Sequence, residues 1–182
     1  MPYDVTVEKQ TPCGMLLLKG GRTAQDRFAE VLGIDIPHIP NTVTVHDIYS
    51  VLWLGPEEWL LILPETDEYR IASELSHDAA GGWGVAIIVS DHYSVITIRG
   101  SETAEVLQQA CGIDIHPQEF SVGQCCRCAF ARTTAIVRPL DSQDTYELIV
   151  ESSYARYAEH WLFRAMGACH LTQLVRTWTM RH

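Results

Sequence analysis

One stretch of this chain occurs twice, and that repeat constrains the fold more than any other feature. Residues 16–36 (LLLKGGRTAQDRFAEVLGIDI) align without a gap on residues 95–115 (VITIRGSETAEVLQQACGIDI), at an offset of 95 − 16 = 79 positions. Both copies contain an apolar strand, a glycine turn, an apolar helix face and a Gly-Ile-Asp-Ile exit. Self-similarity of this kind indicates a fold built from two related units.

The sequence around each copy predicts the same order of elements. Each half reads β-α-β-β-α-β, which is the ferredoxin-like order. We predict an α+β fold of two tandem ferredoxin-like (βαββαβ) pseudo-repeats with mostly antiparallel sheets. The first covers residues 1–89 and the second residues 90–182, and the two pack as one compact domain because no Pro/Ser-rich linker separates them near Ser90.

Several local features carry more specific predictions. Residues 1–14 form a lead-in, residues 85–89 (VAIIV) a fully buried strand, residues 128–137 a single apolar strand and residues 171–176 the last strand. Helix starts are predicted from hydroxyl and acid side chains, and helix ends from glycine. The predicted N-caps are Thr23, Asp67, Ser101 and Ser152 or Ser153, and the predicted helix-ending glycines are Gly33 and Gly112.

Composition excludes several function classes. The 182 residues carry a net charge of −10, which argues against non-specific binding to nucleic acid or to an anionic membrane. No apolar run approaches the roughly 20 residues of a membrane span, and the N-terminus lacks the apolar segment of a secretory signal. Without an export signal, the six cysteines are expected to be reduced in the cytoplasm.

Nucleotide, flavin and metalloprotease fingerprints are absent. The chain has no GxGxxG after a strand, no GxxxxGK[ST] and no HExxH. The Gly-rich run at residues 81–84 ends a helix, so it cannot direct helix N–H groups at a phosphate. We therefore expect no catalytic residues in this chain, and these fingerprints assign no metal ligands.

The densest group of reactive side chains is Cys125-Cys126-Arg127-Cys128. Cys125 and Cys128 make a CxxC, a spacing that can hold zinc or form a redox pair, and Cys111 and His116 lie upstream as further ligands. The alternative is that small apolar side chains pack along a strand. Packing along a strand is the favoured interpretation, because the sequence contains no second CxxC. A metal site at these cysteines remains the alternative hypothesis.

Two acidic groups have both a local and a functional interpretation. Asp35 and Asp114 follow the helix-ending Gly-Ile of each copy, where a carboxylate can accept nearby backbone N–H bonds in an Asx turn. The run Asp91-His92-Tyr93 reads as an acid/base cluster or as a strand-entry turn. In both cases the structural reading is favoured.

Aromatic residues in the second half suggest a contact surface. Trp and Tyr are enriched at the buried centres of interfaces. The interface candidates are Tyr154, Tyr157 and Trp161 on the last helix and Trp178 in the tail.

Residues 50–170 resemble the gamma subunit of heterotetrameric sarcosine oxidase, within a group of folate-binding aminomethyltransferase-like domains. Residues 54–61 (LGPEEWLL) are close to the family's LGPDEWLL, and residues 111–117 (CGIDIHP) to its C.iDLhP. Ser90-Asp91, Ser153-Tyr154-Ala155 and Trp161-Leu162 follow at the expected places. Ser152 is a departure, because the family usually has Arg there.

The resemblance implies a supporting role. In such enzymes FAD, FMN, NAD and tetrahydrofolate are held by other subunits, and the gamma subunit assembles with alpha, beta and delta subunits. The complex demethylates sarcosine to glycine, passes the one-carbon unit to tetrahydrofolate or releases formaldehyde, and forms hydrogen peroxide. The alternative is a stand-alone folate-binding or aminomethyltransferase-like one-carbon protein, although full transferases are about twice as long.

Overall fold

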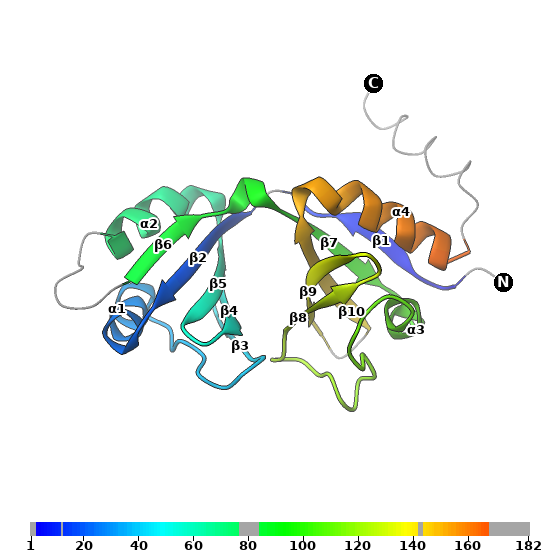
Figure 1. Cartoon of the computed structure of the whole chain (residues 1–182), viewed down its shortest axis with the longest axis horizontal. Coiled ribbons are helices and arrows are strands. Elements are labelled where there is room, and N and C mark those ends of the chain that lie inside the picture. Colours follow the sequence, from blue (N-terminus) through cyan, green and yellow to red (C-terminus); the bar gives the residue numbers. More distant parts are fainter. Residues whose placement is uncertain (1–2, 12, 77–83, 142–143, 168–182) are drawn as a thin grey trace, which may run out of the picture.

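The chain folds into two antiparallel five-stranded sheets that face each other, with helices on the outside (Figure 1). The computed structural model describes residues 3–11, 13–76, 84–141 and 144–167. In spatial order the first sheet contains β3 (Val43–His46), β4 (Tyr49–Gly55), β5 (Glu58–Leu63), β2 (Gly14–Gly20) and β6 (Gly84–Ile88). The second contains β8 (Cys126–Phe130), β9 (Thr133–Pro139), β10 (Thr145–Glu151), β7 (Tyr93–Arg99) and β1 (Thr6–Lys9).

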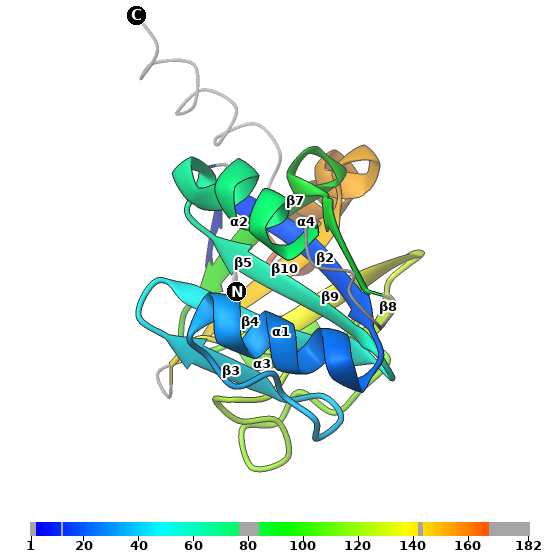
Figure 2. The same cartoon turned by 90° about the vertical axis from the view of Figure 1, so that its left-hand side faces the viewer.

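Two helices cover the outer face of each sheet. Helices α1 (Arg22–Leu32) and α2 (Glu68–Ser76) lie in front of the first sheet in Figure 2. Helices α3 (Thr103–Gln108) and α4 (Ala155–Ala165) cover the second. Three short 3-10 turns, η1 (Glu65–Asp67), η2 (Ser90–His92) and η3 (Ser152–Tyr154), precede α2, β7 and α4. Among the described residues, no helix has the length and apolar character that crossing a membrane requires.

The predicted α+β class and the related order of the two halves are confirmed. The order β4-β5-β2-β6 in the first sheet corresponds to β9-β10-β7-β1 in the second, and β3 corresponds to β8. The position that β6 fills in the first sheet is taken in the second by β1, from the N-terminus. Residues 6–9 are therefore a strand, where the sequence predicted a lead-in. The predicted strand at residues 171–176 lies outside the described residues, and the division at residue 89 stays a proposal.

Strand alternation divides the apolar side chains between an outer and an inner layer. On β2, Leu16 and Leu18 pack under the helices, whereas Met15 faces the second sheet. On β10, Leu148 and Val150 pack under the helices, whereas Ile149 faces the first sheet. Because neighbouring side chains of a strand point to opposite faces, apolar runs such as these bury both faces of each sheet.

The predicted strand at residues 128–137 was wrong. This segment is the hairpin of β8 and β9, which turns at Ala131 with φ of 50°. Both strands are apolar on one face, and the turn contains neither Gly nor Pro, the usual turn residues. Arg132, within the turn, is the polar interruption that could have indicated it.

The predicted burial of residues 85–89 was also wrong. In the part of the chain that the structure describes, strand β6 pairs only with β2, so it forms an edge of the first sheet. Val85 and Ile87 remain 44% and 47% exposed. A β-branched run predicts a strand but does not show whether a second strand will lie on its far side.

Helix capping by side chains was predicted incorrectly at most positions. Helix α1 begins after Gly21 and α3 after Glu102, and neither cap makes a side-chain hydrogen bond. Ser101 donates instead to Asp4, and 3-10 turns precede α2 and α4. At the helix ends, Gly33 adopts the predicted left-handed conformation with φ of 64°. Gly112 does not, because α3 ends at Gln108.

Gly100 lies directly against the backbone of the N-terminal segment at Asp4 and Val5, and we expect Gly100→Ala to be strongly destabilising. Its φ is 136°, and an added Cβ would lie 2.0 Å from the carbonyl oxygen of Asp4. Strain and overlap together should lower the free energy of unfolding by more than about 2 kcal/mol, measured by urea denaturation. At Gly55 an added Cβ meets only Glu58 Cβ at 3.9 Å, so Gly55→Ala should stay within about 0.5 kcal/mol. Equal losses would contradict this placement of Gly100.

Candidate functional site

The inner face, where the two sheets meet, is filled mainly by apolar side chains. Both sheets contribute to this cluster, and Cys125, in the loop directly before β8, also belongs to it. Its buried members are Met15, Leu52, Leu54, Leu60, Val95, Cys125, Ile136 and Ile149. Polar and charged side chains are found around this cluster, so any chemistry on this face belongs to its margins.

At one margin, an inter-sheet ion cluster of Lys19, Glu58 and Arg127 joins the sheets. The Glu58 carboxylate on β5 accepts from Lys19 Nζ on β2 at 3.0 Å and from Arg127 Nη1 on β8 at 2.8 Å. Arg127 Nη2 also donates to the carbonyl oxygen of Leu54 at 3.3 Å. Burial alone would raise the pKa of Glu58, but the hydrogen bonds from Lys19 and Arg127 outweigh it and lower that pKa.

A second ion pair lies deeper on the inner face of the second sheet. Arg138 on β9 and Glu147 on β10 are cross-strand partners, 8% and 9% exposed, with Nε and Oε2 2.6 Å apart. Cys13 lies within the electrostatic reach of both. Burial raises the pKa of the Cys13 thiol, the charge of Glu147 raises it further, and Arg138 opposes the rise. This thiol is therefore protonated at neutral pH and is a poor nucleophile.

Glu68 fixes the joint between the first sheet and the segment that enters the second. This buried carboxylate at the start of α2 accepts from the Met15 backbone N–H at 3.2 Å and from the Ser90 hydroxyl. Met15 N–H also donates to Ser90 Oγ at 2.8 Å. Ser90, part of the motif that resembles the sarcosine oxidase family, thus positions the chain between the two halves.

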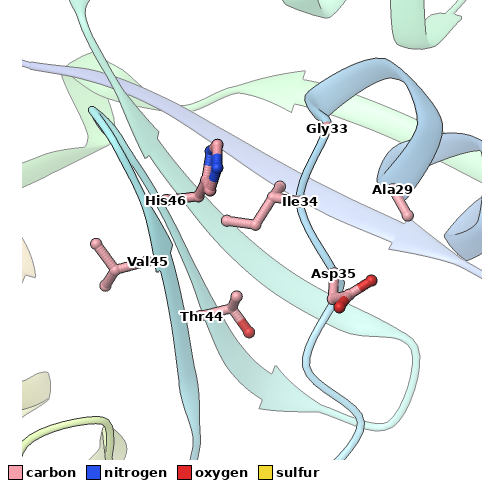
Figure 3. A pocket seen from close by; sticks show the side chains of 7 residues that line it. All are labelled: Ala29, Gly33, Ile34, Asp35, Thr44, Val45 and His46. Carbon is pink, nitrogen blue, oxygen red and sulfur yellow. The ribbon is translucent and has the colours of Figure 1, made fainter.

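The two repeated acids differ in their contacts. Asp114 Oδ1 accepts from the His116 backbone N–H at 2.8 Å, which is the predicted Asx turn. Asp35 lines an open hollow of about 280 Å³ between the end of α1 and β3. Figure 3 shows its carboxylate directed away from the His46 ring, so the two do not form an acid–base pair.

The run Asp91-His92-Tyr93 forms the predicted strand entry. It spans η2 and the first residue of β7, and the His92 ring packs edge-on against Tyr93 with ring centroids 4.7 Å apart. Asp91 and His92 share no hydrogen bond. These residues therefore lack the geometry of an acid/base cluster.

Strand geometry separates the cysteines of the CxxC. Cys125 belongs to the inner-face cluster, and its thiol donates to the carbonyl oxygens of Thr42 and Trp53 at 3.5 and 3.4 Å. Cys128 packs on the opposite face, under the helices of the second sheet. The pair cannot chelate one ion, and within the described ranges no group of three or more His, Cys, Asp or Glu side chains could hold a metal.

The interface candidates of the last helix share one side of it. Tyr154, Tyr157 and Trp161 are spaced i, i+3 and i+7, which places them in one row. Tyr154 is 44% exposed, and Tyr157 and Trp161 are half-buried. The Trp161 ring packs edge-on against Phe130 with centroids 5.3 Å apart. Trp178 lies outside the described residues.

Sequence reasoning missed the inter-sheet ion cluster, the Arg138–Glu147 pair and Glu68. For the first two, a signal was available. Lys19 ends the apolar run of β2, and Arg138 and Glu147 interrupt apolar strands at inward-facing positions. A charge in such a position needs a partner, because an unpaired buried charge is costly.

The family model and the relatives that match this sequence all belong to one family. The model of the family described as sarcosine oxidase, gamma subunit, matches residues 21–168. Sarcosine oxidase subunit gamma from Corynebacterium sp. (strain P-1) is 30% identical over 141 residues, which are 77% of this chain and 68% of that protein. The subunit from an Arthrobacter species is 29% identical over 147 residues, which are 80% and 71% of the two chains.

Solved structures extend the similarity to the fold. A chain of the heterotetrameric sarcosine oxidase from Corynebacterium sp. U-96, in complex with pyrrole 2-carboxylate, has a TM-score of 0.82 at 26% identity and covers 91% of this chain and 86% of that chain. The glycine cleavage system aminomethyltransferase T from Bartonella henselae has a TM-score of 0.63 at 12% identity, over 89% and 46% of the chains. The second match confirms an aminomethyltransferase-like fold.

The inter-sheet ion cluster should stabilise the protein only above acidic pH. The pKa of Glu58 is lowered on folding, so its contribution is complete above the ordinary value of 4.5 and is lost as the pH falls through the lower folded pKa. At pH 7, Glu58→Gln should lower the free energy of unfolding by about 1 kcal/mol, because these side chains are partly solvated. Denaturant unfolding between pH 3 and 7 measures the difference. Glu57→Gln, an exposed neighbour, serves as the control, and a difference that persists unchanged at pH 3 would contradict the prediction.

The Arg138–Glu147 pair should show strong coupling between its partners. Removing one partner leaves a buried charge, so Arg138→Met or Glu147→Leu alone should cost about 3–5 kcal/mol of unfolding free energy. The double variant should recover most of that loss. Arg70→Met, which breaks exposed ion pairs with Asp67 and Glu74, is the control and should cost far less than either single variant. Additive losses in the double-variant cycle would show that the pair is solvated.

Proposed function

The chain belongs to the sarcosine oxidase gamma subunit family, and we propose that it is the non-catalytic gamma subunit of a heterotetrameric sarcosine oxidase-like flavoenzyme. The observation that carries the proposal is the match over most of the chain, in both sequence and fold, to a subunit of such an enzyme. The apolar filling of the inner face supports it, because the charged groups there pair with one another.

In this proposal the chemistry belongs to the partner subunits. Alpha, beta and delta subunits would hold FAD, FMN, NAD and tetrahydrofolate. The complex would demethylate sarcosine to glycine, pass the one-carbon unit to tetrahydrofolate or release formaldehyde, and form hydrogen peroxide. This chain would contribute surface and rigidity, and we retain the cytoplasm as its expected location.

The surface we assign to partner contact is the aromatic row, defined as Tyr154, Tyr157 and Trp161. A row of half-exposed aromatic rings on a packed helix offers large contact area at little entropic cost, because the rings are already held in place. Trp161 is fixed by Phe130, and Tyr154 extends the row to the exposed start of α4. Trp178 remains a further candidate from the sequence.

Purification of the tagged chain from its native cells, followed by an absorption spectrum, tests the proposal. Larger subunits and a flavin spectrum should accompany the chain. A colourless, solitary protein would overturn the subunit assignment. Titration of that protein with tetrahydrofolate would then test the alternative, a stand-alone folate-binding protein.

A charge in the aromatic row should weaken assembly. We expect Tyr154→Glu to reduce the flavin that co-purifies with the chain at least tenfold, which corresponds to about 1.4 kcal/mol. Tyr69→Glu is a matched control, because Tyr69 lies at the start of α2 and is 77% exposed. If the two variants retain flavin equally while the wild type assembles, the row is not the interface and the subunit assignment stands.

A further inference from the structure

Three thiols meet where the chain after α3 runs beside β8. Cys111 forms an isolated antiparallel bridge with Phe130. Two backbone hydrogen bonds flank the bridge, from Gly112 N–H to the Ala129 oxygen at 3.0 Å and from Ala131 N–H to the Ala110 oxygen at 2.9 Å. These contacts fix Cys111 alongside the strand that carries Cys126 and Cys128.

Strand alternation brings the three side chains to one face. Cys126 and Cys128 are two residues apart on β8, so both point toward α3 and α4. Cys111 and Cys128 are buried in the same core cluster, and Cys126 packs against it while half-exposed. The Cys111 and Cys126 thiols are therefore close enough to Cys128 to influence its ionisation. We name Cys111, Cys126 and Cys128 the thiol cluster.

The thiol cluster favours one thiolate. The interaction with Cys111 lowers the pKa of Cys128 most, and burial raises it. The Gly112 N–H and Cys126 lower that pKa further, and the net result is a pKa of about 7. The same interaction and burial raise the pKa of Cys111. A thiolate is the form of cysteine that reacts with peroxides.

We propose that the thiol cluster is a peroxide-oxidisable site, in which Cys128 is the reacting thiol and Cys111 closes a disulfide with it. The inference rests on the placement of the thiols and stands without the proposed function. The oxidant is hydrogen peroxide, which the proposed complex would also release.

The two steps balance. The Cys128 thiolate sulfur attacks one peroxide oxygen, the O–O bond breaks, and the hydroxide that leaves takes a proton to become water. The product is a sulfenic acid. The Cys111 sulfur then attacks the Cys128 sulfur, the S–O bond breaks, and a second water leaves. Two thiols are oxidised and one peroxide is reduced, so the sum is 2 RSH + H₂O₂ → RSSR + 2 H₂O.

Cys111 is the better partner for the disulfide than Cys126. Residues two apart on one strand have Cα atoms about 6.6 Å apart, near the upper limit for a disulfide. β8 is also held in register by its ladder with β9. Cys111 lies on the neighbouring segment, opposite Phe130, and shares the buried core cluster with Cys128.

Peptide mapping of the full chain tests the site. The reduced protein is treated with a small excess of hydrogen peroxide, alkylated and digested. We expect a Cys111–Cys128 cross-link to form first and, in Cys111→Ser, a dimedone adduct on Cys128. Cys128→Ser should slow oxidation of the cluster at least tenfold, whereas Cys125→Ser, an inner-face control, should leave it unchanged. Oxidation of Cys13 or Cys125 as fast as that of Cys128 would overturn the proposal.

A measurement on the wild type keeps the test independent of variant folding. The rate at which iodoacetamide alkylates Cys128 should reach half its maximum near pH 7, because only the thiolate reacts. Mass spectrometry assigns the rate to the residue. A midpoint above pH 8.5, the range of an ordinary cysteine, would exclude Cys128 as the reacting thiol.

Discussion

The whole structure depends on the burial of both faces of each sheet. Strands β2, β5, β7 and β10 carry apolar side chains on both sides, and helices cover only the outer side of each sheet. Each sheet would leave an apolar face in water if it stood alone, at about 25 cal/mol for every Å² exposed. The two halves therefore stabilise each other, because each covers the apolar inner face of the other.

This constraint decides where charged groups can lie. The inner face accepts charges only where a partner is fixed beside them, as in the inter-sheet ion cluster and the Arg138–Glu147 pair. Groups paired in this way are poor candidates for proton transfer to a substrate. The remaining exposed surface lies outside, on the helices and sheet edges, and it includes the aromatic row that we propose as the partner contact.

The sequence predicted those parts of the fold that depend on local pattern. The apolar strands, the hairpin of β4 and β5 and the left-handed Gly33 were all readable from alternation and turn residues. Features that depend on distant segments were not. β1 pairs with β7, which lies far along the chain. Among the described residues no strand pairs with the far side of β6, so β6 is exposed. The Ser101 hydroxyl donates to Asp4 and does not cap its helix. Among the site residues, the contacts of Glu58 and Arg127 need both sheets in place.

The two copies of the repeat differ at the end of their first helix, where the second copy carries a cysteine. Leu32 and Cys111 occupy equivalent repeat positions, and both are buried beside the end of a helix. In the first copy, Gly33 turns the chain away in a left-handed conformation. In the second, the Gly112 N–H donates to the Ala129 carbonyl oxygen at 3.0 Å, which holds Cys111 beside β8. A shared scaffold position therefore serves packing alone in one half and places a thiol beside two others in the second.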